Sequence, residues 1–281
     1  MPYLITGATG EIGSHVVEHL LHQGERPRVF VRNAQKARER YGNRVDITVG
    51  DLRDANSLRA ALHGIDALFL VNSGPVLARL DRAAAHAAKA AGTKLLVKLS
   101  SFDAQHTVGT GVWHAQGEAA IRDSGIAFTF VQPTGFMSNA LWWAPSIKAE
   151  GVVRCATGSG KIPFIHADDI AAVALNALRG AFIGQALPIT GPQALSYAEM
   201  ALKIASAIGK PIRFELLSEV QERQKMIEIG ESEEMIAAHL SIYKAIREGR
   251  LATVTGTVER VLGRPPLSFD HWVQQHASSF R

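Results

Sequence analysis

The run Pro2-Tyr3-Leu4-Ile5-Thr6-Gly7-Ala8-Thr9-Gly10-Glu11-Ile12-Gly13 decides the fold of this chain. A short apolar segment leads into three glycines, and a stretch with helical periodicity follows over residues 14–23. Gly24 ends that stretch, and a second apolar segment begins at Arg28. The order strand, glycine-rich turn, helix, strand predicts a βαβ unit that seats a dinucleotide pyrophosphate at the helix N-terminus.

Each glycine of this turn has a physical task. Gly7 permits the tight turn, Gly10 lets the backbone approach the phosphates, and Gly13 lets the helix pack closely on the strand. The spacing is Gly-x-x-Gly-x-x-Gly, and an ordinary strand–helix turn is the alternative interpretation. The position between a strand and a helix favours a cofactor site. Its expected contacts are Thr6, Gly7, Thr9, Gly10, Glu11, Ile12 and Gly13.

The end of the second strand predicts which dinucleotide binds. An acidic residue about twenty positions after the glycines usually holds the free ribose hydroxyls of NAD(H). Here the chain reads Val31-Arg32-Asn33, and no acid follows until Glu39. Because a guanidinium can clamp a phosphate, Arg32 favours the 2′-phosphate of NADP(H) over NAD(H). A solvated surface charge at Arg32 is the alternative.

The composition is that of an ordinary globular protein: 281 residues, 47% hydrophobic and 20% charged. One large domain, or one domain with an appendage, fits this length. The single Cys155 excludes an internal disulfide, and with a first strand that leaves no room for a signal peptide it predicts a cytoplasmic protein. No stretch approaches the ~18 apolar residues of a membrane span. The net charge of +4 includes no dense basic run, so we expect no nucleic-acid partner.

Strands and helices alternate over the first 130 residues. The expected strands are continuous apolar runs, which are typical of a parallel sheet covered on both faces. We therefore predict an α/β fold with a doubly wound parallel sheet (Rossmann) and a smaller, mostly helical C-terminal substrate or lid domain. The predicted domains are 1–182, in which 135–165 contribute to the substrate pocket, and 183–281. Later strands are expected at 45–49, 66–71, 94–99 and 127–131, with helices at 57–62, 77–91 and 113–124.

Ligands of such a fold lie at the carboxyl ends of the strands. Asp51 and Leu52 follow the third strand and are expected to hold the adenine, although a helix cap or turn is a comparable role for Asp51. Asn72 and Ser73 follow the fourth strand and are expected beside the nicotinamide ribose. Ser100, after the fifth strand, completes the predicted cofactor rim.

Aromatic and flexible apolar side chains gather after Pro133. Phe136, Met137, Trp142 and Trp143 predict a substrate-pocket wall, and core packing at a domain junction is the alternative. Further on, residues 218–250 predict a charged helical segment that serves either as a lid over the cofactor or as a plain helix pair.

Four parts of the chain together resemble a known family. They are the Thr6–Gly13 turn, Gly50-Asp51-Leu52, the Phe164–Ala171 run and the Leu262–Pro266 tail. These segments are similar to those of atypical short-chain dehydrogenase/reductases. The NmrA-like branch, with its azoreductase, type 2 quinone oxidoreductase and triphenylmethane reductase members, is the most similar. The resemblance spans nearly the whole chain and implies an NAD(P)H-dependent oxidoreductase.

The expected catalytic pair departs from the common pattern of that superfamily. Typical members carry Tyr-x-x-x-Lys on the helix after the fifth strand, where this chain reads Trp113-His114-Ala115-Gln116-Gly117-Glu118. The resemblance implies that His114 and Glu118 take those positions, one turn apart on a shared face. His114 is then the predicted proton donor and Glu118 its orienting group; a surface pair without chemistry is the alternative. Ser101 or Phe102 would occupy the place of the usual catalytic serine.

Without Tyr and Lys, ordinary alcohol–ketone chemistry is disfavoured. We expect hydride transfer from NADPH to a flat, electron-poor acceptor such as a quinone, azo compound, imine or dye, with neither flavin nor metal. The alternative is an NmrA-like sensor that binds NADP(H) without catalysis. The expected partner is a small-molecule acceptor, and the chain is expected to be a monomer or a homodimer.

Overall fold

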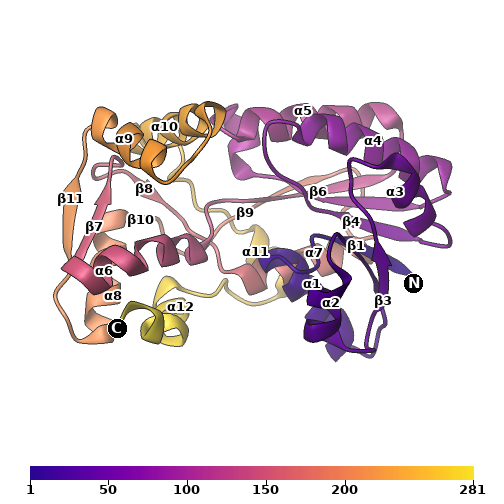
Figure 1. Cartoon of the computed structure of the whole chain (residues 1–281), viewed down its shortest axis with the longest axis horizontal. Coiled ribbons are helices and arrows are strands. Elements are labelled where there is room, and N and C mark those ends of the chain that lie inside the picture. The colour runs from indigo at the N-terminus through magenta and orange to yellow at the C-terminus, as the bar shows by residue number, and fades with distance from the viewer.

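A computed structural model describes all 281 residues. Its main sheet has seven parallel strands in the order β3-β2-β1-β4-β5-β6-β9 (Figure 1). The order reverses between β1 and β4, as in a doubly wound fold, so the predicted fold class is confirmed. The strands are β1 (Tyr3–Thr6), β2 (Arg28–Val31), β3 (Asp46–Val49), β4 (Ala67–Leu70), β5 (Leu95–Leu99), β6 (Phe128–Pro133) and β9 (Ala186–Ile189).

Helices cover both faces of this sheet, which explains why β1, β4 and β5 are buried at every residue. One layer packs α1 against α7, and the opposite layer packs α4 against α5. The first layer contains α1 (Glu11–His22), α2 (Ala34–Tyr41), α7 (Ala167–Leu178) and α11 (Thr257–Leu262). The second contains α3 (Ala55–Ala61), α4 (Leu77–Ala90) and α5 (Gly111–Ser124).

A second unit with its own apolar core lies at the other end of the elongated molecule. Its strands form two short pairs, β7 (Val152–Cys155) with β11 (Arg213–Leu216), and β8 (Lys161–Ile162) with β10 (Leu195–Ser196). Its helices are α6 (Ala144–Glu150), α8 (Tyr197–Ile208), α9 (Glu219–Glu228), α10 (Glu233–Arg247) and α12 (Phe269–His276). Three 3₁₀ segments are η1 (Phe102–His106), η2 (Met137–Trp143) and η3 (Ala277–Phe280).

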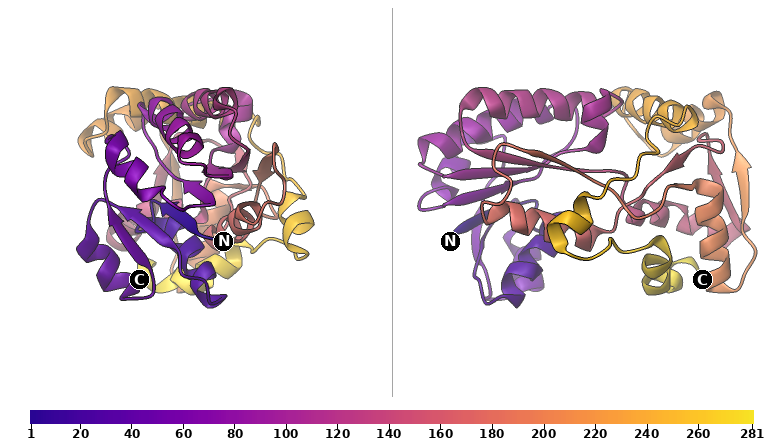
Figure 2. Two further views of the ribbon diagram at one scale, coloured as in Figure 1. Left: turned by 90° about the vertical axis from the view of Figure 1, so that its right-hand side faces the viewer. Right: turned by 180° about the vertical axis from the view of Figure 1, so that it is seen from behind.

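The chain does not divide between these units at residue 182 as expected. β9 belongs to the main sheet, where Leu187 lies opposite Val131 of β6. The C-terminal tail also returns to the first unit, since the Thr255 amide donates to Thr190 Oγ1 and α11 packs on α7. It then crosses back to α12 (Figure 2). The apolar strand pairs with the free edge of β6 because an unpaired edge leaves its backbone groups unsatisfied.

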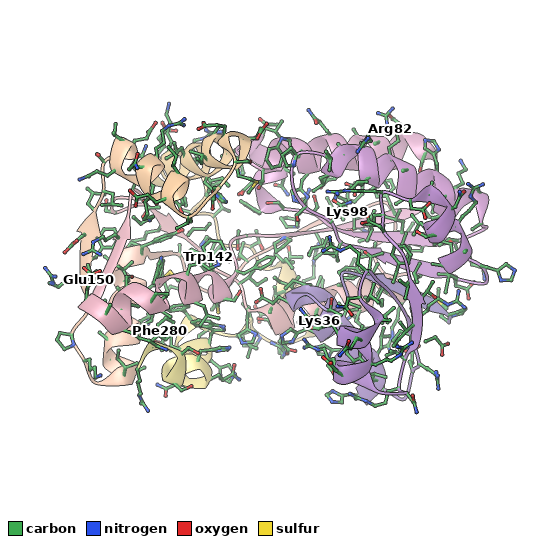
Figure 3. All side chains as sticks on the ribbon, in the orientation of Figure 1. Lys36, Arg82, Lys98, Trp142, Glu150 and Phe280 are labelled. Carbon is green, nitrogen blue, oxygen red and sulfur yellow. The ribbon has the colours of Figure 1, made fainter.

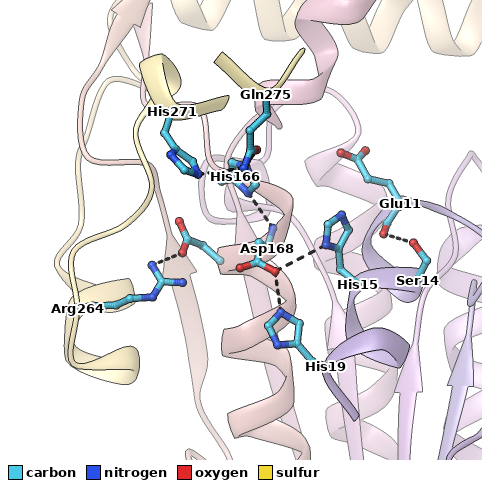
Figure 4. Close-up of polar contacts among 10 residues, drawn as sticks. Glu11, Ser14, His15, His19, His166, Asp168, Arg264, His271 and Gln275 are labelled. Atoms are coloured by element: carbon cyan, nitrogen blue, oxygen red, sulfur yellow. Dashed lines mark hydrogen bonds and ion pairs between the residues drawn. The ribbon is translucent and has the colours of Figure 1, made fainter. Parts of the chain in front are cut away.

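Two acids at the start of α7 tie neighbouring elements together (Figure 4). Asp169 is fully buried, accepts the Leu267 amide at 2.7 Å and pairs with Arg264 at 2.7 Å, which anchors the tail. Asp168 contacts His19 Nε2 at 2.7 Å and His15 Nδ1 at 3.7 Å, which joins α7 to α1.

Candidate functional site

The glycine turn leaves the start of α1 open to an anion. Gly7 has φ +62°, a left-handed conformation that favours glycine. A Cβ on Gly13 would lie 2.3 Å from the Gly7 carbonyl oxygen, so only glycine permits this close packing. Gly10 caps α1 without any side-chain hydrogen bond. The unpaired amides of the first turn therefore suit a pyrophosphate, and this part of the chain fits a dinucleotide.

A cavity of about 480 Å³ begins at this turn and runs along the carboxyl ends of β1, β2, β3 and β4. Nine of the predicted cofactor contacts line it: Thr6, Gly7, Thr9, Gly10, Arg32, Asp51, Leu52, Asn72 and Ser73. The other four lie elsewhere. Ile12 and Gly13 are buried within α1, Glu11 faces a cavity beside α12, and Ser100 lines a different cavity after β5.

We call this cavity, which begins at the glycine turn, the cofactor cavity, after the cofactor that the sequence predicts. Three cations are among its lining residues: Arg32, Lys36 and Arg53. None of them forms an ion pair within the chain, so all three are available to an anionic ligand. Asp51 Oδ1 accepts the Arg53 amide at 2.9 Å, which is the turn role considered for it, and Asp51 also lines the cavity. Sequence reasoning overlooked Arg53, although it directly follows the Gly50-Asp51-Leu52 segment at a strand end.

A second cavity of about 250 Å³ lies at the ends of the next strands, β5 and β6, and is roofed by α10. We call it the acceptor cavity, after the acceptor that the sequence predicts. Gly109 brings the loop before α5 against α10, since a Cβ there would lie 2.5 Å from the Ala238 carbonyl oxygen. The polar and aromatic residues that line the acceptor cavity are Ser100, Ser101, Asp103, Thr110, His114, Thr134, Phe136, Asn139, Trp142, Phe164, Tyr197, His239 and Tyr243.

The four expected wall residues separate into two groups. Phe136 and Trp142 line the acceptor cavity, and Trp142 is 68% exposed at the junction of the two units (Figure 3). Met137 is buried in the core of the second unit, and Trp143 packs against Tyr197 with ring centroids 5.0 Å apart. Neither Met137 nor Trp143 lines the cavity, so core packing, the alternative interpretation, describes both.

His114 faces the acceptor cavity from the first turns of α5. Its Nδ1 is buried without a hydrogen-bond partner. Burial, and then the positive charge of Lys98, lower the pKa of His114 to about 3. At neutral pH the imidazole is therefore uncharged, and it can donate a hydrogen bond but holds no readily released second proton.

Lys98 belongs to β5 (Figure 3), and its side chain reaches from the sheet to a carboxylate of α4. Lys98 and Asp81 are both fully buried and their Nζ and Oδ2 atoms are 2.6 Å apart. Asn72 Nδ2 donates to the other Asp81 oxygen at 2.7 Å. A Cβ on Gly117 would lie 2.1 Å from Asp81 Oδ2, so α5 needs glycine where it passes this carboxylate. The network connects the cofactor cavity, through Asn72, with the helix that carries His114.

Glu118 does not hydrogen-bond to His114. Its Oε1 accepts from Ser100 Oγ at 2.5 Å and from Gln132 Nε2 at 2.7 Å, and Arg122 is 3.3 Å from its Oε2. Glu118 is buried and orients Ser100, which in turn lines the acceptor cavity. Of the two serine-site candidates, Ser101 lines that cavity, whereas Phe102 is buried in the core of the second unit.

No group of three or more His, Cys, Asp or Glu side chains is arranged to hold a metal ion. None of the helices is both long and apolar enough to cross a membrane.

A family model described as NAD(P)H-binding matches residues 7–180, the segment that builds the cofactor cavity. The chain belongs to this NAD(P)H-binding family. It is 39% identical to an NAD(P)H azoreductase of Xenophilus azovorans over 99% of this chain and 98% of that one. The predicted resemblance to NAD(P)H-dependent oxidoreductases of the azoreductase and type 2 quinone oxidoreductase kind is thereby confirmed.

Solved structures agree with this assignment. The NADPH-dependent quinone oxidoreductase of Escherichia coli, solved with NADPH, superposes with a TM-score of 0.88 at 27% identity, over 98% of this chain and 99% of that one. A mutant NmrA superposes with a TM-score of 0.78 at 14% identity over 98% and 94%, which shows a shared fold alone.

Proposed function

We propose that this chain is an NADPH-dependent reductase that transfers hydride to a flat, electron-poor acceptor such as a quinone or an azo compound. The observation that carries the proposal is the pair of cavities at the ends of neighbouring strands, one beside the glycine turn and one with an aromatic lining. The printed names of its relatives, azoreductase and quinone oxidoreductase, support the same acceptor class.

NADP(H) is the preferred cofactor in this proposal. Arg32, Lys36 and Arg53 support it because three unpaired cations at the end of the cofactor cavity suit a 2′-phosphate. Asp51 is the one acid among the lining residues, and its side chain is engaged by the turn. When bound, the reduced nicotinamide supplies the hydride.

The acceptor cavity would hold the acceptor flat and exclude water. Phe136, Trp142, Tyr197 and Tyr243 provide ring surfaces along its walls, and α10 closes it from above. His114 donates a hydrogen bond to the acceptor as a neutral imidazole, which helps to hold it in place. Glu118 does not contact the acceptor in this proposal; it acts indirectly, by fixing the position of the Ser100 hydroxyl.

The test is oxidation of NADPH in the presence of quinones, azo dyes and triphenylmethane dyes, compared between wild type and Trp142→Ala. Loss of the indole should lower kcat/KM for the acceptors by about tenfold, because ring stacking contributes on the order of 1 kcal/mol. Ile229→Ala is the matched control, since Ile229 is also 68% exposed but lies outside both cavities. Equal effects of the two substitutions would contradict the proposed acceptor site.

A further inference from the structure

Asp103 enters the acceptor cavity at the start of η1, directly after β5. Ser101 sets its position, because the Asp103 amide donates to Ser101 Oγ at 3.2 Å and so begins the 3₁₀ turn. Gly111 allows this turn to pack against α5, since a Cβ there would lie 2.2 Å from the Asp103 carbonyl carbon. Asp103 is thus held at the cavity wall as a half-buried residue.

Asp103 differs from the buried carboxylates of this chain in having no cationic partner. Asp81 pairs with Lys98 at 2.6 Å, Asp169 with Arg264 at 2.7 Å, and Glu118 with Arg122 at 3.3 Å. No Lys, Arg or His nitrogen lies within ion-pair distance of Asp103. Where a carboxyl group is partly shielded from water and has no counter-charge, its ionised form is costly in free energy, so the neutral form is favoured.

The surroundings of Asp103 contain further titratable groups but none that neutralises it. His106 lies on its own element, and the cavity brings His114 from α5, Tyr197 from α8, and His239 and Tyr243 from α10. Burial raises the pKa of Asp103 to about 6, although a hydrogen bond from Ser101 opposes part of that rise. About half of the protein therefore carries the neutral acid at pH 6 and about a tenth at pH 7, whereas His114, with its pKa lowered to about 3, is almost entirely uncharged at both.

We propose that Asp103 is the proton donor to the reduced acceptor in this cavity. This inference rests on the proposed reductase function and assigns the acid role to Asp103, leaving His114 as a hydrogen-bond donor. A carboxylic acid that meets the acceptor directly suits general acid catalysis, which contributes roughly 10²–10⁴-fold to rates.

The reaction balances with one hydride and one proton. Hydride from the reduced cofactor adds to one end of the quinone π system or of the azo N=N bond, and that π bond breaks. The electron pair moves to an oxygen or the second nitrogen, which takes the proton from the Asp103 carboxyl group. The carboxylate left behind regains a proton from water. A cationic triphenylmethane dye differs, because hydride added to its central carbon completes the reduction without a proton.

This difference provides the test. In Asp103→Asn, kcat for a quinone and for an azo dye should fall by roughly 10²-fold or more, while kcat for a cationic triphenylmethane dye should change by less than about threefold. NADPH affinity and the unfolding temperature should stay at wild-type values. Asp123→Asn is the matched control, because Asp123 is an exposed acid on α5 outside both cavities.

Two measurements on the wild-type protein test whether Asp103 carries a proton near pH 6. The protonated acid is the active form, so kcat/KM for the quinone should fall as the pH rises through about 6, and Asp103→Asn should lose this dependence. The ¹³C carboxyl resonance of Asp103 in the free protein should titrate near pH 6. Titration near the ordinary aspartate value of about 3.9 would overturn the inference without any assay of activity.

The remaining outcomes separate this inference from the proposed function. Unchanged quinone and azo kinetics in Asp103→Asn, with a raised KM for the cationic dye alone, would mean that Asp103 binds cations, and the proton-donor role would be overturned. A wild-type protein that reduces no acceptor would overturn the proposed function and this inference together.

Discussion

Arg32 is the residue that tests the proposed preference for NADPH most directly. Arg32→Asp should raise the Kd for NADPH by about 10- to 100-fold, because a charge-assisted contact to the 2′-phosphate contributes roughly 1.5–3 kcal/mol. The Kd for NADH, which lacks that phosphate, should change by less than about threefold. Fluorescence titration of the reduced cofactors measures both constants.

Arg38→Asp is the control for this substitution. It makes the same change of charge on α2 but at an exposed position outside the cofactor cavity. If Arg32→Asp weakened the binding of NADPH and of NADH equally, the contact with the 2′-phosphate would be refuted. If Arg32→Asp and Arg38→Asp weakened NADPH binding equally, the effect would come from the net charge of the protein and not from a specific contact.

His114 is expected to position the acceptor. Removing its ring in His114→Ala should lower turnover about 10-fold or more while NADPH affinity stays unchanged, and His114→Gln, which keeps an N–H donor, should recover part of the loss. Because the pKa of His114 is lowered to about 3, wild-type activity should show no step between pH 5 and 9 that disappears in His114→Gln. Unaltered turnover in His114→Ala would remove this residue from the reaction.

Sequence reasoning was most successful for residues whose task depends on the backbone. The three glycines, and strand-end residues such as Asp51 and Asn72, follow from the order of elements, and the structure gathers them at one sheet edge. Side-chain direction within η2 does not follow from sequence, which is why Trp142 lines the cavity and the adjacent Trp143 packs in a core. Asp103 was overlooked because nothing in a sequence shows that a carboxyl group lacks a counter-ion.

At the scale of elements, the buried Lys98–Asp81 pair joins β5 to α4. Lys98→Met should lower the free energy of unfolding by about 3–5 kcal/mol, because it leaves the Asp81 carboxylate buried and uncompensated. The double variant Asp81→Leu/Lys98→Met removes both charges and should recover more than half of that loss. Urea unfolding measures both; a double variant no more stable than the single one would contradict this account.

The contact between α1 and α7 should weaken in acid. Contacts with the imidazoles of His15 and His19 hold the pKa of Asp168 well below its usual range. A depressed pKa contributes stability above the ordinary value of about 3.9, and that stability is lost as the pH falls below it. Asp168 is 36% exposed, so we expect about 1 kcal/mol at most.

Asp168→Asn should therefore lower the unfolding temperature at pH 6 by roughly 2–4 °C, and this difference from wild type should shrink as the pH falls below 4. Scanning calorimetry across that range provides the comparison, with Asp123→Asn as the exposed control. A difference that is constant with pH would show that ionisation of Asp168 is not its cause.

The boundaries of an element were predictable where the hydrophobic periodicity ends at a glycine that stops the helix. The helix expected at 77–91 is α4 (Leu77–Ala90), and Gly125 ends α5 in a left-handed conformation. β9 was recognised as a strand but assigned to the wrong unit, because pairing with β6 is a contact across more than fifty residues that local pattern does not encode. The lid interpretation of residues 218–250 stays a prediction; α10 does line the acceptor cavity.

For the whole molecule, the two units share one functional surface. The first unit supplies the cofactor cavity, and the acceptor cavity takes its floor from β5 and β6 and its roof from α10 of the second unit. The C-terminal tail crosses between the units and is fixed to α7 through Asp169. In the proposed function, this arrangement would set a reacting acceptor beside the carboxyl ends of the same sheet that lines the cofactor cavity.

The central claim is direct hydride transfer from NADPH to an acceptor, and a label tests it most directly. NADPH deuterated at nicotinamide C4, on each face in turn, is incubated with the protein and a triphenylmethane dye, and the reduced dye is examined by mass spectrometry. We predict one deuterium at the central carbon of the dye, from one face of the cofactor only. Tight NADPH binding without transfer of label to any acceptor would contradict the reductase and favour a sensor of the cofactor.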